Sequence, residues 1–211
     1  MKESIWIIVF AIIIAVVCSG VLFGVTQFTQ PYREINEEAE RVNNFLIALG
    51  APLDENAGSE EIINFFKKNV RIRKINGFEF YEYYPGSTTS GEPSAIAIPF
   101  SGSGLWAPIK GVIALEPDLI TIKGIRFYQQ EETPGLGGEI ASDWFQKQFK
   151  GKKILSADGK PGFKITKPGK ARGPNEVDGI TGATMTSERV QAIIDEQAKK
   201  IWEVRDKYVR H

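Results

Sequence analysis

The sequence predicts an α+β protein, in which an N-terminal transmembrane helix is followed by one domain with a small antiparallel sheet flanked by helices. Three features support this prediction: an uncharged apolar run near the N-terminus, a series of short strand-like segments between residues 70 and 128, and amphipathic helical patterns on either side of that series. The 211 residues suffice for one membrane span and one compact domain.

The apolar run extends from Ile5 to Val25, which is 21 residues without a charge. As a helix it would be about 30 Å long, which matches the hydrocarbon core of a bilayer. A cleaved signal peptide is the alternative, but its apolar region usually has only about 7–15 residues. Only Lys2 precedes the run and Arg33 soon follows it, so charge says little about orientation. We expect Pro31 to end this helix or to begin a new element.

Helices and strands are expected to follow in that order. Residues 34–50 have the pattern of an amphipathic helix, and Ser59 is expected to cap a short helix over residues 60–69. Strands are expected at residues 70–84, which contain the hairpin signal Asn76-Gly77, and then at residues 95–100, 109–115 and 119–128, with a flexible turn at 101–104.

The C-terminal part is expected to be mostly helical. Residues 139–149 form an amphipathic pattern with Trp144 on the buried side, and residues 163–166 read as a final strand. From Ser187 to Tyr208 apolar residues recur at helical spacing, which predicts the last helix.

The most informative stretch, residues 178–187, reads DGITGATMTS and leads into this last helix. Free backbone N–H groups and the helix dipole at such a position favour an anion. The simpler interpretation is a helix cap, in which Thr184, Thr186 or Ser187 accepts a backbone N–H from the first turn. The stretch matches neither the Walker pattern nor the dinucleotide-binding fingerprint.

The pattern Asp178-x-x-Thr181-Gly182-Ala183-Thr184 resembles the flavinylation motif of FMN-binding domains, which occur in NqrC of the Na+-translocating NADH:quinone reductase and in RnfG of the Rnf electron transport complex. Two further segments are similar to the family, ETPGLG at residues 132–137 and GLW at residues 104–106. The resemblance implies an anchor over residues 1–30, a helical stalk and the start of the extracytoplasmic domain over residues 31–85, and the FMN-binding domain over residues 86–211.

The resemblance also implies the roles of individual residues. FMN is expected to be attached covalently to Thr184 through a phosphoester. The other expected cofactor-binding residues are Asp178, Thr181, Gly182 and Ala183 in the motif, Leu105, Trp106 and Leu136 beside the flavin ring, Glu132, Thr133 and Gly137 in the loop at residues 132–137, and Lys164 near the flavin or its phosphate. From the residues alone, Trp106 could equally be a tryptophan buried under a loop.

Composition limits the chemistry that the chain can perform by itself. A threonine hydroxyl is a weak nucleophile, and the only histidine is the last residue, so we expect a separate flavin transferase that uses FAD and Mg2+. One cysteine and one histidine argue against a metal site or a histidine-based hydrolase site. The balance of 26 basic and 26 acidic residues does not indicate a nucleic-acid partner.

The resemblance implies an electron-transfer protein of an Rnf- or Nqr-type ion-translocating complex in the cytoplasmic (inner) membrane, rather than a complete enzyme. Its expected partners are the other membrane subunits and membrane lipid, with the FMN domain on the extracytoplasmic side. The run ETPGLGGEI favours NqrC, whereas the chain length favours RnfG. Two alternatives are a stand-alone flavinylated carrier and a non-redox, membrane-tethered binding protein whose Thr184 loop is only a helix cap.

Overall fold

The computed structural model describes residues 2–54, 56–86 and 91–209. Its elements in chain order are α1 (Lys2–Leu49), α2 (Ser59–Asn69), β1 (Val70–Ile75), β2 (Phe78–Tyr83), β3 (Ala95–Ser103), β4 (Pro108–Leu115), β5 (Ile122–Gln129), the 3-10 helix η1 (Gly137–Ala141), α3 (Asp143–Lys147), β6 (Lys164–Thr166), β7 (Glu176–Asp178) and α4 (Thr184–Val209).

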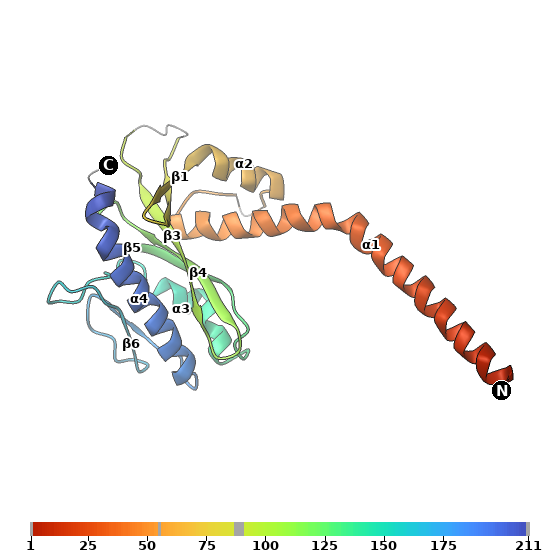
Figure 1. Ribbon diagram of the computed structural model, residues 1–211. Coiled ribbons are helices and arrows are strands. Elements are labelled where there is room, and N and C mark those ends of the chain that lie inside the picture. Colours follow the sequence, from red (N-terminus) through yellow and green to blue (C-terminus); the bar gives the residue numbers. More distant parts are fainter. Residues whose placement is uncertain (1, 55, 87–90, 210–211) are drawn as a thin grey trace.

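Strands β1 to β5 form one antiparallel sheet in sequence order, and helices cover both of its faces (Figure 1). The predicted hairpin is confirmed, with Asn76 and Gly77 at positive φ between β1 and β2. Side chains alternate along β3: Ile96 and Ile98 belong to the core under α4, whereas Ala97 belongs to the core under α1 and α2. The predicted boundary at residue 85 lies in the β2–β3 connection of this single sheet.

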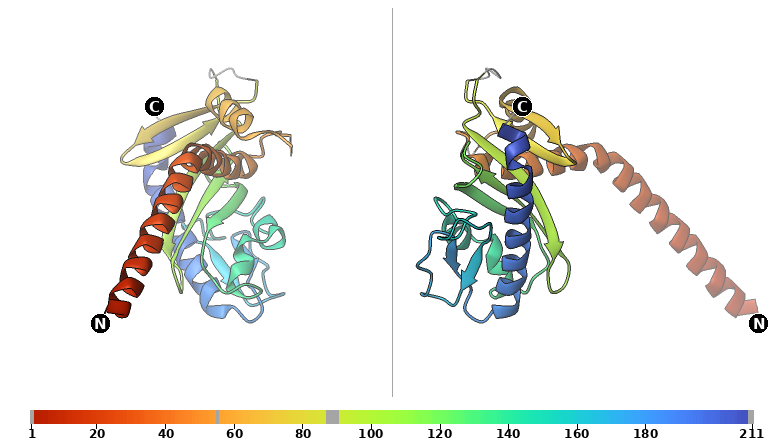
Figure 2. Two further views of the ribbon diagram at one scale, coloured as in Figure 1. Left: turned by 90° about the vertical axis from the view of Figure 1, so that its right-hand side faces the viewer. Right: turned by 60° about the vertical axis from the view of Figure 1, so that its left-hand side comes forward.

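The N-terminal helix α1 is one continuous element, so the prediction that Pro31 ends it or begins a new element is wrong. Proline removes one backbone hydrogen bond but does not prevent the helix from continuing, and it commonly bends it. Figures 1 and 2 show the free part of α1 leaving the domain at a different angle from the packed part. The free part is exposed, apolar and long enough to cross a membrane, whereas Val42, Phe45 and Leu46 are buried in the domain.

Three other local predictions are corrected. Ser59 does not cap α2: Gly58 occupies the cap position, and the Ser59 hydroxyl donates to Asn36 Oδ1 at 2.8 Å. Residues 101–103 continue β3 instead of turning, because Gly102 pairs with Ile109 and leaves room for the side chain of Ile193 on α4. The last strand of the sheet begins at Ile122 rather than residue 119.

The region predicted as a helix over residues 139–149 contains the shorter elements η1 and α3. Trp144 was predicted on the buried side, but its side chain is 48% exposed and its Nε1–H donates to Glu139 Oε2 at 3.1 Å. The two short parallel strands β6 and β7 lie beside this region; β6 confirms the strand predicted at residues 163–166, whereas β7 was not predicted.

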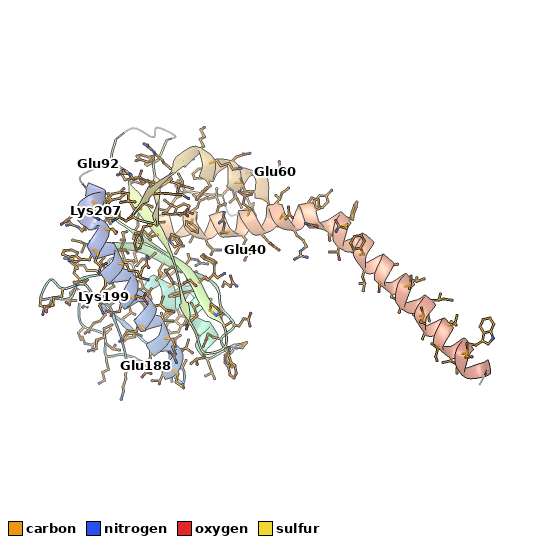
Figure 3. The ribbon with its side chains drawn as sticks, in the orientation of Figure 1. Glu40, Glu60, Glu92, Glu188, Lys199 and Lys207 are labelled. Carbon is orange, nitrogen blue, oxygen red and sulfur yellow. The ribbon has the colours of Figure 1, made fainter. Side chains whose placement is uncertain are left out.

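Helix α4 confirms the prediction for residues 187–208, with Val190, Ile194 and Ile201 fully buried against the sheet. Figure 3 labels Glu188 near the start of α4 and Lys207 near its end, and the start lies at the same end of the domain as the β3–β4 hairpin tip. The far end of α4 is held at the sheet, where the Tyr208 hydroxyl donates to the buried Glu82 carboxylate at 2.7 Å.

Candidate functional site

The motif begins at Asp178, the last residue of β7, and its carboxylate fixes the preceding loop. Asp178 Oδ1 accepts the backbone N–H groups of Lys170 and Ala171, each at 2.8 Å, and the Thr166 hydroxyl at 3.4 Å. The Ala171 N–H is the main cause that lowers the pKa of Asp178 below its ordinary value. The carboxylate is therefore a structural acceptor that holds residues 167–173 beside the motif.

The backbone of the motif is held just as firmly. The side-chain amide of Gln148 bonds both backbone groups of Asp178, accepting its N–H at 3.0 Å and donating to its C=O at 3.2 Å. The next residue, Gly179, donates its N–H to the Thr166 carbonyl at 2.8 Å, and a side chain at Gly179 would collide with that carbonyl. The motif therefore leaves the sheet along a single defined path.

A tight turn then brings the chain into α4. The Ala183 N–H donates to the Ile180 carbonyl at 3.1 Å, and Gly182 within the turn has φ +79°. This left-handed conformation favours glycine. Leu136 Cδ2 lies 3.1 Å from the position that a Cβ of Gly182 would occupy, so the loop at residues 132–137 lies directly against the motif.

Thr184 is the first residue of α4, and its side chain is exposed. Within the described residues, the Thr184 hydroxyl has no hydrogen-bond partner, and the backbone N–H groups of Thr184, Met185 and Thr186 donate to no other group. None of the three candidate hydroxyls caps the first turn: Thr186 donates to a carboxylate, and Ser187 Oγ accepts the N–H of Ile180 at 3.3 Å. The helix start thus presents an unpaired hydroxyl beside unpaired N–H groups.

A buried carboxylate joins the three loops around this helix start. Glu132 is only 4% exposed; its Oε1 accepts the Leu105 N–H and its Oε2 accepts the Thr186 hydroxyl, both at 2.7 Å. Two glycines make room for it, because a Cβ at Gly104 would lie 2.6 Å from Oε1 and a Cβ at Gly137 would lie 3.0 Å from Oε2. Both oxygens of Glu132 are therefore already used by protein groups.

Exposed apolar side chains surround the helix start. Trp106 is 75% exposed at the β3–β4 tip, which contradicts the alternative of a tryptophan buried under a loop. Leu105, Leu136 and Met185 are also exposed, although they belong to three different segments. The side chain of Met185 was not among the predicted cofactor-binding residues. Its position directly after Thr184 is the signal that could have identified it. The structure thus brings the predicted residues 105, 106 and 136 to one end of the domain.

The contacts of two other predicted residues, Lys164 and Thr133, do not indicate a role in cofactor binding. Lys164 is exposed on β6, where its Nζ lies 3.9 Å from Glu176 Oε1. Thr133 is exposed, and its carbonyl accepts the N–H groups of Leu136 and Gly138, which closes the turn of its loop. Their contact with a cofactor stays a prediction.

An open cleft of about 480 Å³ borders the motif. Asp178, Gly179, Ile180 and Thr181 of the motif line it. The other lining residues are Trp144, Gln148, Pro168 and Gly169. The motif is therefore accessible from this cleft as well as at the exposed side chain of Thr184.

Residues 104–199 match the family model described as FMN-binding domain. The NqrC protein of the Na+-translocating NADH-quinone reductase from Pasteurella multocida (strain Pm70) is 28% identical over 218 residues, which cover 85% of this chain and 84% of that protein. The corresponding protein from Vibrio campbellii is 44% identical over 103 residues, which cover 48% and 40%, respectively.

Two solved structures are also similar to this chain. The crystal structure of the corresponding protein from Parabacteroides distasonis matches with a TM-score of 0.67 and 27% identity, and the match covers 81% of this chain and 93% of that one. The structure of Shewanella oneidensis NqrC also has a TM-score of 0.67, over 82% of this chain and 99% of that one. Its 23% identity supports the fold alone.

Proposed function

We propose, because residues 104–199 match the family model of the FMN-binding domain, that the chain is the NqrC-type electron carrier of a Na+-translocating NADH:quinone reductase, with FMN attached covalently to Thr184. One observation supports the attachment site most directly. The Thr184 hydroxyl is exposed and unpaired at the first position of α4, whereas Thr186 and Ser187 have their hydroxyls engaged.

The surroundings of Thr184 fit a phosphoester. The unpaired N–H groups of Met185 and Thr186 and the positive end of the dipole of a 26-residue helix favour a negative charge at this point. The positive φ of Gly182 and the buried side chain of Ala183 set the direction in which the helix begins. The conformation of the turn thus explains why the motif has glycine at position 182 and alanine at position 183.

The apolar rim fits a flavin ring. Leu105, Trp106, Leu136 and Met185 offer exposed apolar surface within reach of a group tethered at the helix start. FMN would supply the electron-accepting and electron-donating centre. The residues of this chain would hold it and exclude water from part of its surface. Because Glu132 already uses both oxygens, we assign it the role of holding these loops together rather than contacting the ribityl chain.

Attachment requires a second protein. In our proposal the Thr184 oxygen forms a bond to the flavin-side phosphorus of FAD, the bond from that phosphorus to the AMP oxygen breaks, and AMP leaves. The hydroxyl proton passes to a base of the flavin transferase, and Mg2+ balances the phosphate charge. The chain's only histidine is residue 211, which lies outside the described residues, so none of the described residues offers an imidazole base here.

The relatives described above are all NqrC proteins, which favours an Nqr-type complex over an Rnf-type one. The apolar part of α1 is the membrane anchor in this proposal. The other membrane subunits of the complex are the partners. We place the FMN domain on the extracytoplasmic side, as the family resemblance implies, where covalent attachment would prevent loss of the cofactor.

The test is to co-express the full chain with an active flavin transferase, and to compare the wild type with Thr184→Ala, Thr184→Ser and Ser101→Ala. We expect an FMN-sized mass increment and flavin fluorescence in denatured gels for the wild type and for Ser101→Ala, which loses an exposed hydroxyl on β3. Thr184→Ala should carry no flavin, and Thr184→Ser should regain part of it. Flavin retained in Thr184→Ala would refute the attachment site.

A further inference from the structure

Charge is distributed very unevenly along this neutral chain. Residues 147–173 carry nine cationic side chains against one anionic side chain, a net charge of +8, so the rest of the chain carries −8. The nine are Lys147, Lys150, Lys152, Lys153, Lys160, Lys164, Lys167, Lys170 and Arg172, and the one acid is Asp158. A concentration of one sign on one part of a surface steers charged partners.

Part of this charge is neutralised locally. Lys147 pairs with Asp143 at 3.3 Å, Lys160 with Asp158 at 3.7 Å, and Lys164 with Glu176 at 3.9 Å. Among the cations of residues 147–173, all of which the structure describes, five exposed ones have no ion pair: Lys150, Lys153, Lys167, Lys170 and Arg172. Three of these five lie in the loop at residues 167–172.

This loop is held rigidly next to the flavinylation motif. Asp178 accepts the N–H groups of Lys170 and Ala171, and Glu176 Oε2 accepts those of Arg172 and Gly173 at 3.0 and 2.9 Å. The Arg172 guanidinium also donates to the Ala171 and Gly169 carbonyls, so it lies over its own loop. The backbone that carries these three cationic side chains is thus held in place beside the proposed FMN site.

The same loop borders the open cleft of about 480 Å³, because Pro168 and Gly169 line it together with Ile180 and Thr181. Trp144 lines this cleft and is 48% exposed. An aromatic side chain in a hollow, with charged residues at its rim, is the usual arrangement of a protein–protein contact, in which tryptophan and arginine often contribute most of the binding energy. A flat lipid surface does not require such a hollow.

We infer that Trp144 together with Lys167, Lys170 and Arg172 forms a docking surface for an acidic face of the protein that exchanges electrons with this chain. The inference rests on the proposed function for the identity of the partner as a redox protein. The positive loop would attract the acidic face and orient it, and Trp144 would fill the contact. A partner bound there would lie directly against Thr181 and the rest of the motif.

The test measures how fast individual lysines of the full chain react with an amine-acylating reagent, by quantitative mass spectrometry. One sample is native membranes that contain the whole complex, and the other is the purified full chain reconstituted alone into vesicles rich in anionic phospholipid. A partner that covers nine in ten copies should slow the labelling of Lys167 and Lys170 about tenfold in native membranes. Lys67 and Lys68, exposed in the last turn of α2 at the other end of the domain, should react equally in both samples (Figure 1).

Each outcome decides the inference. Equal labelling of Lys167 and Lys170 in both samples would overturn it, and protection in the chain reconstituted alone would show that anionic lipid, not a protein, covers the loop. A carbodiimide, which couples lysine amines to carboxylates in contact, should link Lys167 or Lys170 to an acidic residue of another protein in native membranes. The Thr184→Ala chain is labelled in parallel. If Lys167 and Lys170 are protected in native membranes without bound flavin, the docking surface is supported even if the attachment proposal fails.

Discussion

Replacing Glu132 by alanine should destabilise the domain severely, although no charge partner is lost. The carboxylate is buried and connects the β3–β4 tip, its own loop and the first turn of α4. Alanine removes both hydrogen bonds and leaves the Leu105 N–H and the Thr186 hydroxyl without an acceptor in a space that Gly104 and Gly137 keep open for the carboxylate.

The magnitude follows from these contacts. Each hydrogen bond to a charged acceptor contributes about 1.5–3 kcal/mol, so the loss of two in Glu132→Ala should lower the free energy of unfolding by about 3–6 kcal/mol. Glu132→Gln keeps the shape, because its amide oxygen can accept the Leu105 N–H while its NH2 donates to Thr186 Oγ1. That variant should cost only about 1 kcal/mol. The exposed neighbour Glu131 is the matched control, and Glu131→Ala should change stability by less than about 0.5 kcal/mol.

The assay is urea unfolding of the full chain in detergent, followed by tryptophan fluorescence and by circular dichroism, with free energies compared only where the two transitions coincide. The reasoning would be refuted if Glu132→Ala unfolded within about 1 kcal/mol of Glu131→Ala, or if Glu132→Gln were as unstable as Glu132→Ala. Either result would mean that the carboxylate does not hold the three loops together.

Three further outcomes are expected. The pKa of Asp178 is lowered from 3.8 chiefly by the Ala171 N–H, so the carboxylate anchors residues 167–173 above pH 3.8 and loses this hold as the pH falls below 3.8. The rate of amide hydrogen exchange at Ala171, corrected for its intrinsic pH dependence, should therefore rise below pH 3.8. Asp178→Asn should show this faster exchange already at about pH 6. Tyr208→Phe removes a donor to the buried Glu82 carboxylate and should cost about 2 kcal/mol in urea unfolding, and an unchanged midpoint would contradict this. Gly182→Ala forces a Cβ into positive φ and should cost about 1–2 kcal/mol, together with slower flavin incorporation, whereas normal incorporation would show that the turn is adaptable.

Local patterns in the sequence predicted a large part of this fold. The long apolar N-terminal helix, the Asn76-Gly77 hairpin and the last helix were predictable because each depends on neighbouring residues alone. The signals are an uninterrupted apolar run, two residues that tolerate positive φ, and helical spacing. Predictions failed where a distant element changed the local preference. Pro31 lies within a helix that continues into the packed core, and Gly102 extends a strand because α4 lies over it.

The candidate site likewise has features that the local sequence predicted and features that depend on distant contacts. The chemical identity of the residues around Thr184 came from the sequence, through a motif whose residues are neighbours along the chain. The environment of Glu132 did not, because its two partners lie 27 and 54 residues away and only the packing of α4 against the β3–β4 hairpin brings them together. The position of the loop at residues 167–172 likewise depends on hydrogen bonds to Asp178 and Glu176 that no periodicity encodes.

The sequence by itself therefore determined which segments are apolar, helical or extended, and which residues can carry the chemistry. Only the tertiary structure decided which hydroxyl in the first turn of α4 stays free, which carboxylate is buried, and which cations remain unpaired beside the motif. The physical reason is that a hydrogen bond or ion pair forms only between groups that the fold brings within about 3–4 Å, and chain separation does not predict that distance.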